Sequence, residues 1–240
     1  MSGDASLSVP GALNFRDTGG LPAGTTTTRS GVLYRSGNLF RVDDDGRRAL
    51  GDLGLRRIID LRDDDEVRSE PTVLGDLLIP TQRVPLFLGS VASLFRADMS
   101  LESMYRSLVD DSAPRVLEVV RGVIAEQPVL VHCTIGKDRT GVTIALILAA
   151  AGVDEDAVVA DYARTETLLP AERNAPILAY LRAHHPDAPQ LVDLATRSPA
   201  PVMRALLSDL RQRYGSPADY LRAHGLADAE LTELRRIILL

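Results

Sequence analysis

The sequence lacks the features that would place the protein in a membrane, on nucleic acid or in a disulfide-bonded fold. Its one cysteine among 240 residues excludes an internal disulfide and argues against a zinc fold built on several cysteines. The longest apolar run, residues 142–153, is too short to span a bilayer. No basic segment followed by an apolar one opens the chain, so we expect a cytoplasmic protein without stable membrane insertion. The net charge of −6 argues against a nucleic-acid partner.

The remaining composition is that of one globular domain over residues 1–240. Hydrophobic residues make up 45% and charged residues 25% of the chain, which excludes disorder of the chain as a whole. Apolar segments of strand type alternate with amphipathic segments over the first 150 residues, and this alternation predicts an α/β sheet. The C-terminal third is helical in pattern and is expected to pack on that sheet.

The apolar periodicity and the capping residues place the individual elements. We expect strands at residues 32–35, 57–61, 83–86 and 129–132. We expect helices at residues 43–54, 100–110, 115–127 and 140–151. Asp43 is the expected N-cap and Gly54 the expected stop of the first helix. Residues 1–31 are expected to be irregular or to form a short hairpin, with a loop at residues 25–28.

The most informative stretch is Val-Leu-Val-His-Cys-Thr-Ile-Gly-Lys-Asp-Arg-Thr-Gly at residues 129–141. It places an apolar strand, a seven-residue loop from Cys133 to Arg139 and a helix in series. Such a loop directs backbone N–H groups at one point, and the helix dipole adds partial positive charge there, so the loop should bind a phosphate dianion. Gly136 permits the tight bend that this geometry needs.

Cys133 and Arg139 occupy the two ends of this loop. The loop N–H groups and the Arg139 cation should stabilise the Cys133 thiolate, which is then placed to attack phosphorus. The planar guanidinium of Arg139 can bind two phosphoryl oxygens. A single cysteine is more often a small buried hydrophobic residue, but the whole loop pattern favours a phosphoryl-transfer site that needs neither metal nor cofactor. The only lysine among 27 basic residues is Lys137, which suggests a position that arginine does not fit.

The segment from His132 to Gly141 resembles the His-Cys-x5-Arg-Ser/Thr loop of the protein tyrosine phosphatase superfamily. Its Gly-Lys-Asp-Arg-Thr-Gly form is similar to a bacterial branch, the tyrosine and phosphoinositide phosphatases of the mycobacterial PtpB and listerial LipA type. Outer segments are similar to the same branch: Asn-Phe-Arg-Asp-Thr-Gly-Gly at 14–20, Leu-Tyr-Arg-Ser at 33–36, Ile-Asp-Leu-Arg at 59–62, and Tyr-Gly-Ser at 214–216 with Tyr-Leu at 220–221. The resemblance implies a central, mainly parallel sheet flanked by helices, with a helical lid insertion and a helical C-terminal third.

The resemblance also implies hydrolysis in two steps through a cysteinyl phosphate on Cys133. The residues expected to bind the phosphate are Thr134, Ile135, Gly136, Lys137, Asp138 and Arg139. His132 would orient Cys133, and Thr140 would hydrogen-bond the Cys133 sulfur and help it leave in the second step. Lys137 is either a solvent-facing loop residue or a point charge for a second anionic group of the substrate.

The sequence does not decide which residue is the general acid. Many relatives carry the acid in a Trp-Pro-Asp loop, but this chain has no tryptophan. Asp138 within the phosphate loop is the first candidate by resemblance. Asp60, at the end of a predicted buried strand, is the second, with an ion pair to Arg62 or Arg16 as its structural alternative. The remaining candidates are Asp17, Asp63 and Asp98.

The substrate is likewise open. Residues 87–127 form either a helical lid over the site or helices of the core. The leading hypothesis is a phosphatase acting on phosphotyrosine, with phosphoserine, phosphothreonine and phosphoinositides as further substrates. The alternative is the same chemistry on a small-molecule phosphomonoester of a biosynthetic pathway, so the expected partner is a phosphorylated protein, lipid or small molecule. A non-catalytic phosphate-binding module is disfavoured, because binding alone needs no thiol.

Overall fold

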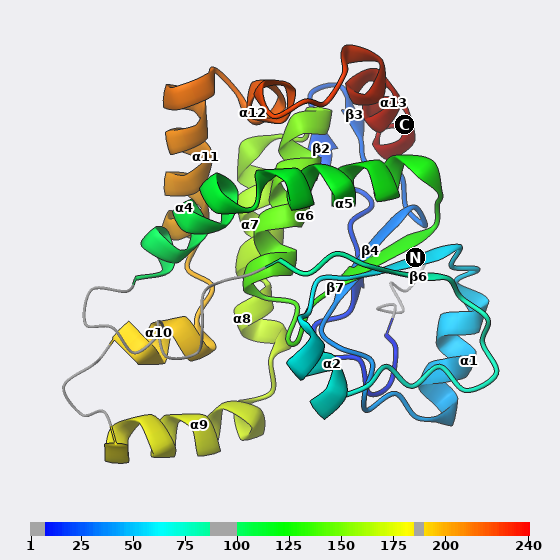
Figure 1. The fold of residues 1–240 in the computed structure, drawn as a ribbon, viewed down its shortest axis with the longest axis vertical. Helices are drawn as coiled ribbons and strands as arrows, with labels where there is room; N and C mark the ends of the chain where they lie inside the picture. Colours follow the sequence, from blue (N-terminus) through cyan, green and yellow to red (C-terminus); the bar gives the residue numbers. More distant parts are fainter. Residues whose placement is uncertain (1–7, 87–99, 185–189) are drawn as a thin grey trace, which may run out of the picture.

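The computed structural model describes residues 8–86, 100–184 and 190–240, and a mixed sheet forms their centre (Figure 1). Its strand order is β1-β4-β7-β5-β6. The strands are β1 (Arg16–Asp17), β4 (Leu33–Ser36), β5 (Arg57–Asp60), β6 (Thr81–Arg83) and β7 (Val129–His132). β4, β7, β5 and β6 run parallel, and only β1 is antiparallel to its neighbour among these strands. The predicted central, mainly parallel sheet is therefore confirmed.

The strand register brings polar residues together at one edge of the sheet. All four residues of β7 are buried, as parallel strands covered on both faces usually are. His132 at the end of β7 pairs with Ser36 of β4 on one side and with Asp60 of β5 on the other. This is the carboxyl edge of the parallel strands, where binding sites form in open α/β sheets.

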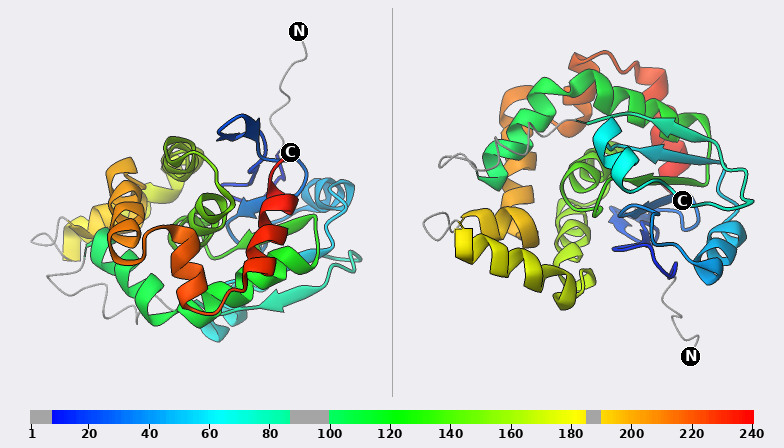
Figure 2. Two further views of the ribbon diagram at one scale, coloured as in Figure 1. Left: turned by 90° about the horizontal axis from the view of Figure 1, so that it is seen from above. Right: turned by 60° about the horizontal axis from the view of Figure 1, so that its bottom comes forward.

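Helices cover both faces of the sheet (Figures 1 and 2). The helices before the catalytic loop are α1 (Asp44–Asp52), α2 (Asp64–Ser69), α4 (Leu101–Asp111) and α5 (Ala113–Ala125). Those after it are α6 (Asp138–Ala151), α7 (Glu155–Ala163), α8 (Thr165–Leu168), α9 (Ala171–His184), α10 (Gln190–Thr196), α11 (Ala200–Tyr214), α12 (Pro217–Ala223) and α13 (Asp228–Ile238). None of them, within the part of the chain that the structure describes, is both long and apolar enough to cross a membrane.

Two hydrophobic clusters divide the core according to the alternation of side chains along the strands. Ile58 and Leu130 face one side of the sheet and pack with Leu50 of α1. Ile59 and Val131 face the other side and pack with the larger helical layer that includes α4, α5 and α6. Period-two alternation therefore gives each face of the sheet its own core.

Most of the expected elements are present, but several boundaries differ; the helix expected at residues 115–127, for example, spans Ala113–Ala125. Asp43 caps α1 by accepting a hydrogen bond from the Gly46 N–H, as predicted. α6 begins at Asp138, before the expected start at residue 140. The third parallel strand is β6 rather than residues 83–86, where Val84 and Leu86 are buried without belonging to a strand. Their burial produced the apolar signal, but the backbone pairing lies just before them.

The N-terminal segment contains the expected short hairpin. It consists of β2 (Pro22–Ala23) and β3 (Thr26–Thr27), which pair antiparallel. The expected loop at residues 25–28 is therefore partly strand. The turn is made by the two residues between the strands, of which Gly24 has a φ of +62°, a backbone region that favours glycine.

The stretch predicted as either lid or core is only partly described. Residues 87–99 lie outside the described residues. The remainder forms α4 and α5, whose buried residues, among them Tyr105, Leu108 and Val120, belong to the larger hydrophobic cluster. Within that remainder the packing is that of core helices. α11, α12 and α13 of the C-terminal third pack against α4, α5, α6 and α7.

Candidate active site

The loop between β7 and α6 has the backbone shape that the sequence predicts. Cys133 directly follows β7 and is 2% exposed. Gly136 has a φ of +70°, and an added Cβ would lie 2.4 Å from the Ser36 carbonyl oxygen. Only glycine allows this loop to close so tightly against the end of β4. The N-terminus of α6 begins immediately afterwards, at Asp138, so its partial positive charge lies at the loop.

Arg139 is held by Glu66, a residue that the sequence did not single out. The Arg139 Nη1 and Nη2 atoms donate to Glu66 Oε2 and Oε1 at 2.6 and 2.5 Å. The Thr134 hydroxyl donates to the same carboxylate. Glu66 belongs to α2, whose capping box with Asp63 marks a helix start in the sequence but gives no sign of this partner. A carboxylate across the loop thus fixes the guanidinium expected to bind phosphate.

The ion pair changes the protonation of Glu66. Burial alone would raise the pKa of Glu66, but the hydrogen bonds and positive charge of Arg139 outweigh burial and lower that pKa to about 2. Glu66 therefore remains ionised at neutral pH. Arg139 keeps its positive charge, because the hydrogen bonds to Glu66 outweigh burial and raise its pKa further.

Glu66→Gln should reduce the free energy of unfolding at neutral pH and remove part of its acid dependence. The folded-state pKa of about 2 lies below the ordinary 4.5, so the ionised group stabilises the fold above about pH 4.5 and this stabilisation disappears as the pH falls towards about 2. The difference in urea-unfolding free energy between wild type and variant should therefore shrink between about pH 7 and about pH 3. Glu118→Gln, in an exposed pair with Arg115, is the control. A wild-type advantage that stayed constant over this range would contradict the prediction.

Asp138, the first candidate acid, has its carboxylate held by two donors. Its Oδ1 atom accepts from the Tyr105 hydroxyl at 2.7 Å and from Lys137 Nζ at 2.6 Å. The Tyr105 hydroxyl also lies 2.7 Å from the Tyr162 hydroxyl. Burial, then the charge of Asp138, raises the pKa of both tyrosines, so both hydroxyls stay protonated. Both of these hydrogen bonds are to the same carboxylate oxygen, Oδ1.

Of the two placements left open for Lys137, the solvent-facing one is wrong. The Lys137 side chain is fully buried, and Nζ donates to Asp138 Oδ1 and, at 3.1 Å, to the Arg197 carbonyl oxygen. The ammonium is directed to Asp138 rather than to a second anionic group of a substrate. A slender ammonium suits this enclosed position better than a guanidinium does, in line with the single lysine in an arginine-rich chain.

Asp60 makes the ion pair that the sequence offered as its structural alternative. Arg62 Nε donates to Asp60 Oδ1 at 2.9 Å and Nη2 to Oδ2 at 2.8 Å. Burial would raise the pKa of Asp60, but the hydrogen bonds from Arg62 and the proximity of His132 outweigh it and lower the pKa. Arg62 thus binds both carboxylate oxygens of Asp60, which leaves neither of them free to donate a proton to a substrate.

His132 directly precedes the loop in the sequence, and Thr140 directly follows it. The His132 ring is buried, and Nδ1 lies 3.2 Å from the Cys133 carbonyl oxygen, so it contacts the backbone of Cys133. Burial lowers the pKa of His132, which keeps the ring neutral. Thr140 Oγ1 is buried and has no hydrogen-bond partner among the residues placed by the structure. The expected hydrogen bond from Thr140 to the Cys133 sulfur is therefore not formed in this structure.

The other carboxylates considered as acids have local structural partners or lie outside the described residues. Asp17 accepts hydrogen bonds from the backbone N–H groups of Gly19 and Gly31. Asp63 caps α2. Asp98 falls in the segment at 87–99 that lies outside the described residues.

Two of the outer sequence motifs, at 14–20 and 33–36, meet beneath the loop. Asn14 Nδ2 and Arg35 Nη2 both donate to the Gly136 carbonyl oxygen, each at 2.9 Å. Arg35 also pairs with Asp161 of α7 at 2.6 Å, and Arg16 pairs with the same carboxylate at 2.7 Å. The structure therefore brings the segments at 14–20 and 33–36 to the loop, as the shared resemblance of these motifs suggests, and adds Asp161, which the sequence analysis missed.

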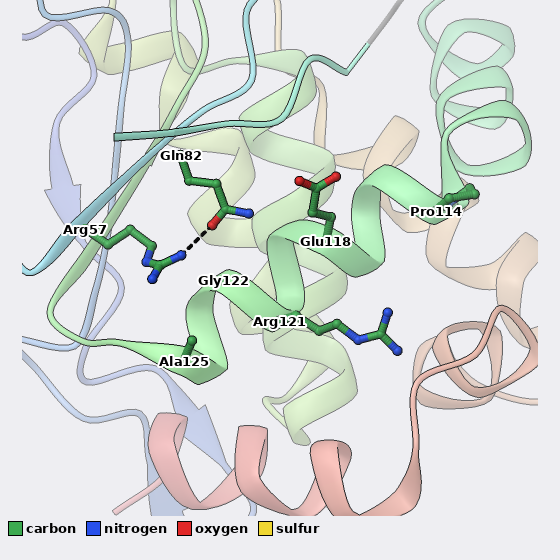
Figure 3. A pocket seen from close by; sticks show the side chains of 7 residues that line it. All are labelled: Arg57, Gln82, Pro114, Glu118, Arg121, Gly122 and Ala125. Carbon is green, nitrogen blue, oxygen red and sulfur yellow. Dashed lines mark hydrogen bonds between the residues drawn. The ribbon is translucent and has the colours of Figure 1, made fainter. Parts of the chain in front are cut away.

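A groove of about 430 Å³ lies at a different place, near the amino end of β5 (Figure 3). Arg57 Nη1 donates to Gln82 Oε1 at 2.7 Å there, and Arg57 also pairs with Glu126. Arg121 pairs with Glu230. The groove is lined by Arg57, Gln82, Pro114, Glu118, Arg121, Gly122 and Ala125. It contains none of the predicted site residues, and both of its arginines already have carboxylate partners.

Two comparisons with known proteins match nearly the whole chain. The model of a family described as the tyrosine phosphatase family matches residues 7–240. The chain is 31% identical to the triple specificity protein phosphatase PtpB of Mycobacterium tuberculosis, over 96% of this chain and 98% of that protein. It is 32% identical to a tyrosine-protein phosphatase of Nostoc commune, over 88% of this chain and 75% of that protein. The crystal structure of P. aeruginosa TpbA aligns with a TM-score of 0.39 and 22% identity, over 69% of this chain and 88% of that chain.

Proposed function

Because the chain belongs to the tyrosine phosphatase family, as its loop motif predicts, we propose that it hydrolyses phosphotyrosine through a cysteinyl phosphate on Cys133. The observation that supports this most strongly is the loop itself. It places a buried cysteine at the end of β7, directly before the N-terminus of α6. Arg139, fixed by Glu66, supplies the cation that a phosphoryl group needs.

The reaction proceeds in two displacement steps. In the first, Cys133 Sγ forms a bond to phosphorus while the bond from phosphorus to the substrate oxygen breaks, and Asp138 protonates that oxygen. In the second, water attacks phosphorus, Asp138 takes its proton, and the bond from phosphorus to sulfur breaks. The products are the alcohol and inorganic phosphate. Loop N–H groups and Arg139 stabilise the negative charge on the phosphoryl oxygens throughout.

We assign the general acid to Asp138 rather than to Asp60. Asp138 belongs to the phosphate loop, and its two donors hold one carboxylate oxygen and leave the other for the substrate. Asp60 instead has both oxygens bound by Arg62. Replacing Asp138 by Asn would keep the shape of the side chain while removing its transferable proton.

Asp138→Asn should lower kcat for phosphotyrosine peptides by about 10²–10⁴-fold. The loss should be much smaller for p-nitrophenyl phosphate, whose leaving group departs without protonation. The measurement is kcat across a series of aryl phosphates of increasing leaving-group pKa. Asp60→Asn is the matched control and should leave the slope of this series unchanged. If Asp138→Asn slowed the hydrolysis of esters with good and poor leaving groups equally, another residue would be the acid.

The substrate class is part of the proposal. A curated relative over nearly the whole chain is described as a triple specificity protein phosphatase, so we propose phosphotyrosine as the main substrate, with phosphoserine, phosphothreonine and phosphoinositides as further substrates. As a separate proposal, we place its action in the cytoplasm. The test is phosphate release, as kcat/KM, with Cys133→Ser as the blank. The panel contains the three phosphopeptide types, phosphoinositides, and sugar and nucleotide monophosphates. If one small phosphomonoester had a far higher kcat/KM than the peptides, the substrate would be a metabolite, and the proposed chemistry would be unchanged.

A further inference from the structure

We propose that Asn14 and Arg35 are positioning residues that hold the phosphate-binding loop with its carbonyl groups turned away from the substrate. This rests on the proposed function, because it takes the loop to bind a phosphoryl group. Neither side chain touches the phosphate in this account. Both act on the backbone of the loop from the side opposite to the substrate.

The argument starts from the geometry of a peptide bond. In a trans peptide the carbonyl of one residue and the N–H of the next point in opposite directions. A loop that offers its N–H groups to an anion must therefore direct its carbonyl groups the other way. Such carbonyl groups are buried in the protein and need donors of their own.

Three successive carbonyl groups of the loop have such donors. The Thr134 carbonyl oxygen accepts from the Asn38 N–H at 3.0 Å. Asn14 Nδ2 donates to the Ile135 carbonyl at 3.3 Å and to the Gly136 carbonyl at 2.9 Å. Arg35 adds a second hydrogen bond to the Gly136 carbonyl at 2.9 Å. With these carbonyl groups fixed, the N–H groups of the three following residues, Ile135, Gly136 and Lys137, point to the opposite side.

The two donors are themselves held in place. Asn14 has a φ of +56°, and its Oδ1 atom accepts from Arg16 Nη1, so its amide nitrogen is turned towards the loop. Arg35 divides its guanidinium between two acceptors, with Nη1 on Asp161 at 2.6 Å and Nη2 on the Gly136 carbonyl. The two contacts come from two different nitrogens of one planar guanidinium, a spacing that a single lysine ammonium does not reproduce.

The charges of this cluster also favour an anion in the loop. Arg16 and Arg35 are 4% and 1% exposed, and they share the single carboxylate of Asp161. Two buried cations on one buried anion leave an excess of one positive charge beneath the loop. Solvent and salt screen such a charge less than an exposed one. The same side chains that fix the loop therefore also contribute to its attraction for a dianion.

The test compares the binding of tungstate, a non-covalent oxyanion, measured as its inhibition constant. Asn14→Gly keeps a backbone that tolerates positive φ and removes the amide donor. Arg35→Lys keeps the positive charge and removes the fork. Each variant should raise the inhibition constant at least about tenfold, the effect of losing hydrogen bonds of roughly 1.4 kcal/mol in binding, and should raise KM. Thr18→Val is the control, since the Thr18 hydroxyl is buried and donates to the Leu33 carbonyl at 2.8 Å without contacting the loop.

A purely structural role predicts a different result. It would lower the unfolding midpoint of all three variants and leave the inhibition constant of the folded protein unchanged, which would overturn the inference. If Asn14→Gly or Arg35→Lys does not fold, Asn14→Asp decides, because it keeps the side-chain shape and the Arg16 contact but replaces the donor by an acceptor. Tungstate binding like that of wild type in Asn14→Asp would overturn the inference. A wild type that neither binds tungstate nor releases phosphate would overturn the proposed function as well, so the two failures are distinguishable.

Discussion

Cys133→Ser should abolish turnover, with kcat falling by at least about 10⁴-fold, while substrate binding is retained. The replaced atom is the proposed nucleophile, and a serine hydroxyl attacks phosphorus far less readily than a cysteine sulfur does. Serine has nearly the same size as cysteine, so the 2%-exposed position of Cys133 should accept it. The N–H groups of the loop and its arginine would remain in place. The measurements are single-turnover phosphate release and calorimetric binding of a phosphotyrosine peptide.

Two further results decide how this loss is interpreted. The urea-unfolding curves of wild type and Cys133→Ser should superimpose, which would exclude unfolding as the cause. Turnover above about one hundredth of the wild-type value would contradict the assignment of Cys133 as nucleophile. Lost turnover together with lost peptide binding would show that serine distorts the loop, and Cys133→Ala would then be the variant to compare.

The loop from Cys133 to Arg139 could be predicted from the sequence because its proposed chemistry is local. The proposed nucleophile, phosphate cradle and guanidinium belong to one run of seven residues, between an apolar strand and an apolar helix. The elements on both sides follow from periodicity and capping, and the structure has them as β7 and α6. These groups are neighbours in the sequence, so predicting that they lie together requires no knowledge of long-range contacts.

The partners that fix this loop could not be predicted in the same way. Glu66 and Asp161 are two of 33 acidic residues, and nothing in their local sequence separates them from solvent-facing carboxylates. Tyr105 lies in a stretch whose periodicity fits a core helix as well as a lid. The order of the strands and the packing of the helices bring these three side chains to the loop. Both depend on contacts between distant parts of the chain.

Lys137 shows how a correct signal can lead to a wrong placement. Its rarity suggested a position that arginine does not fit, and the buried contact with Asp138 agrees with that. The sequence analysis left open an exposed ammonium or one that faces the substrate. Lysine is in general seldom buried without a partner. The sequence does not show that the Arg197 carbonyl, sixty residues further along the chain, accepts a hydrogen bond from this ammonium.

The substrate-facing and inward sides of the loop therefore depend on different parts of the sequence. In the proposed mechanism, hydrolysis of phosphotyrosine uses Cys133, Arg139 and Asp138, all from one motif. The shape of the loop requires Asn14, Arg35 and the N-terminal half of the chain. A variant of Cys133 should therefore lose activity with little change in stability, and a variant of the buried cluster beneath the loop should lose stability.

Asp161→Asn should cause the largest loss of stability, about 3–5 kcal/mol in the free energy of unfolding. It removes the only carboxylate that these two buried cations, Arg16 and Arg35, share in ion pairs within the described part of the chain. Burial and the proximity of Arg35 already lower the pKa of Arg16 to about 10, so its charged state depends on Asp161. For a domain of this size the melting temperature should fall by roughly 10 °C. The measurement is urea and thermal unfolding of the variant beside wild type.

Asp110→Asn is the matched control for this prediction, because it breaks an ion pair with Arg213 in which both side chains are 35% exposed. Its cost should stay below about 1 kcal/mol, since solvent screens and replaces such a pair. Arg16→Met in the Asp161→Asn background removes one of the two uncompensated cations and should restore part of the lost stability. If Asp161→Asn cost no more than Asp110→Asn, burial of the cluster would not be what makes its carboxylate important, and the loop would have to draw its rigidity from the sheet and α6 alone.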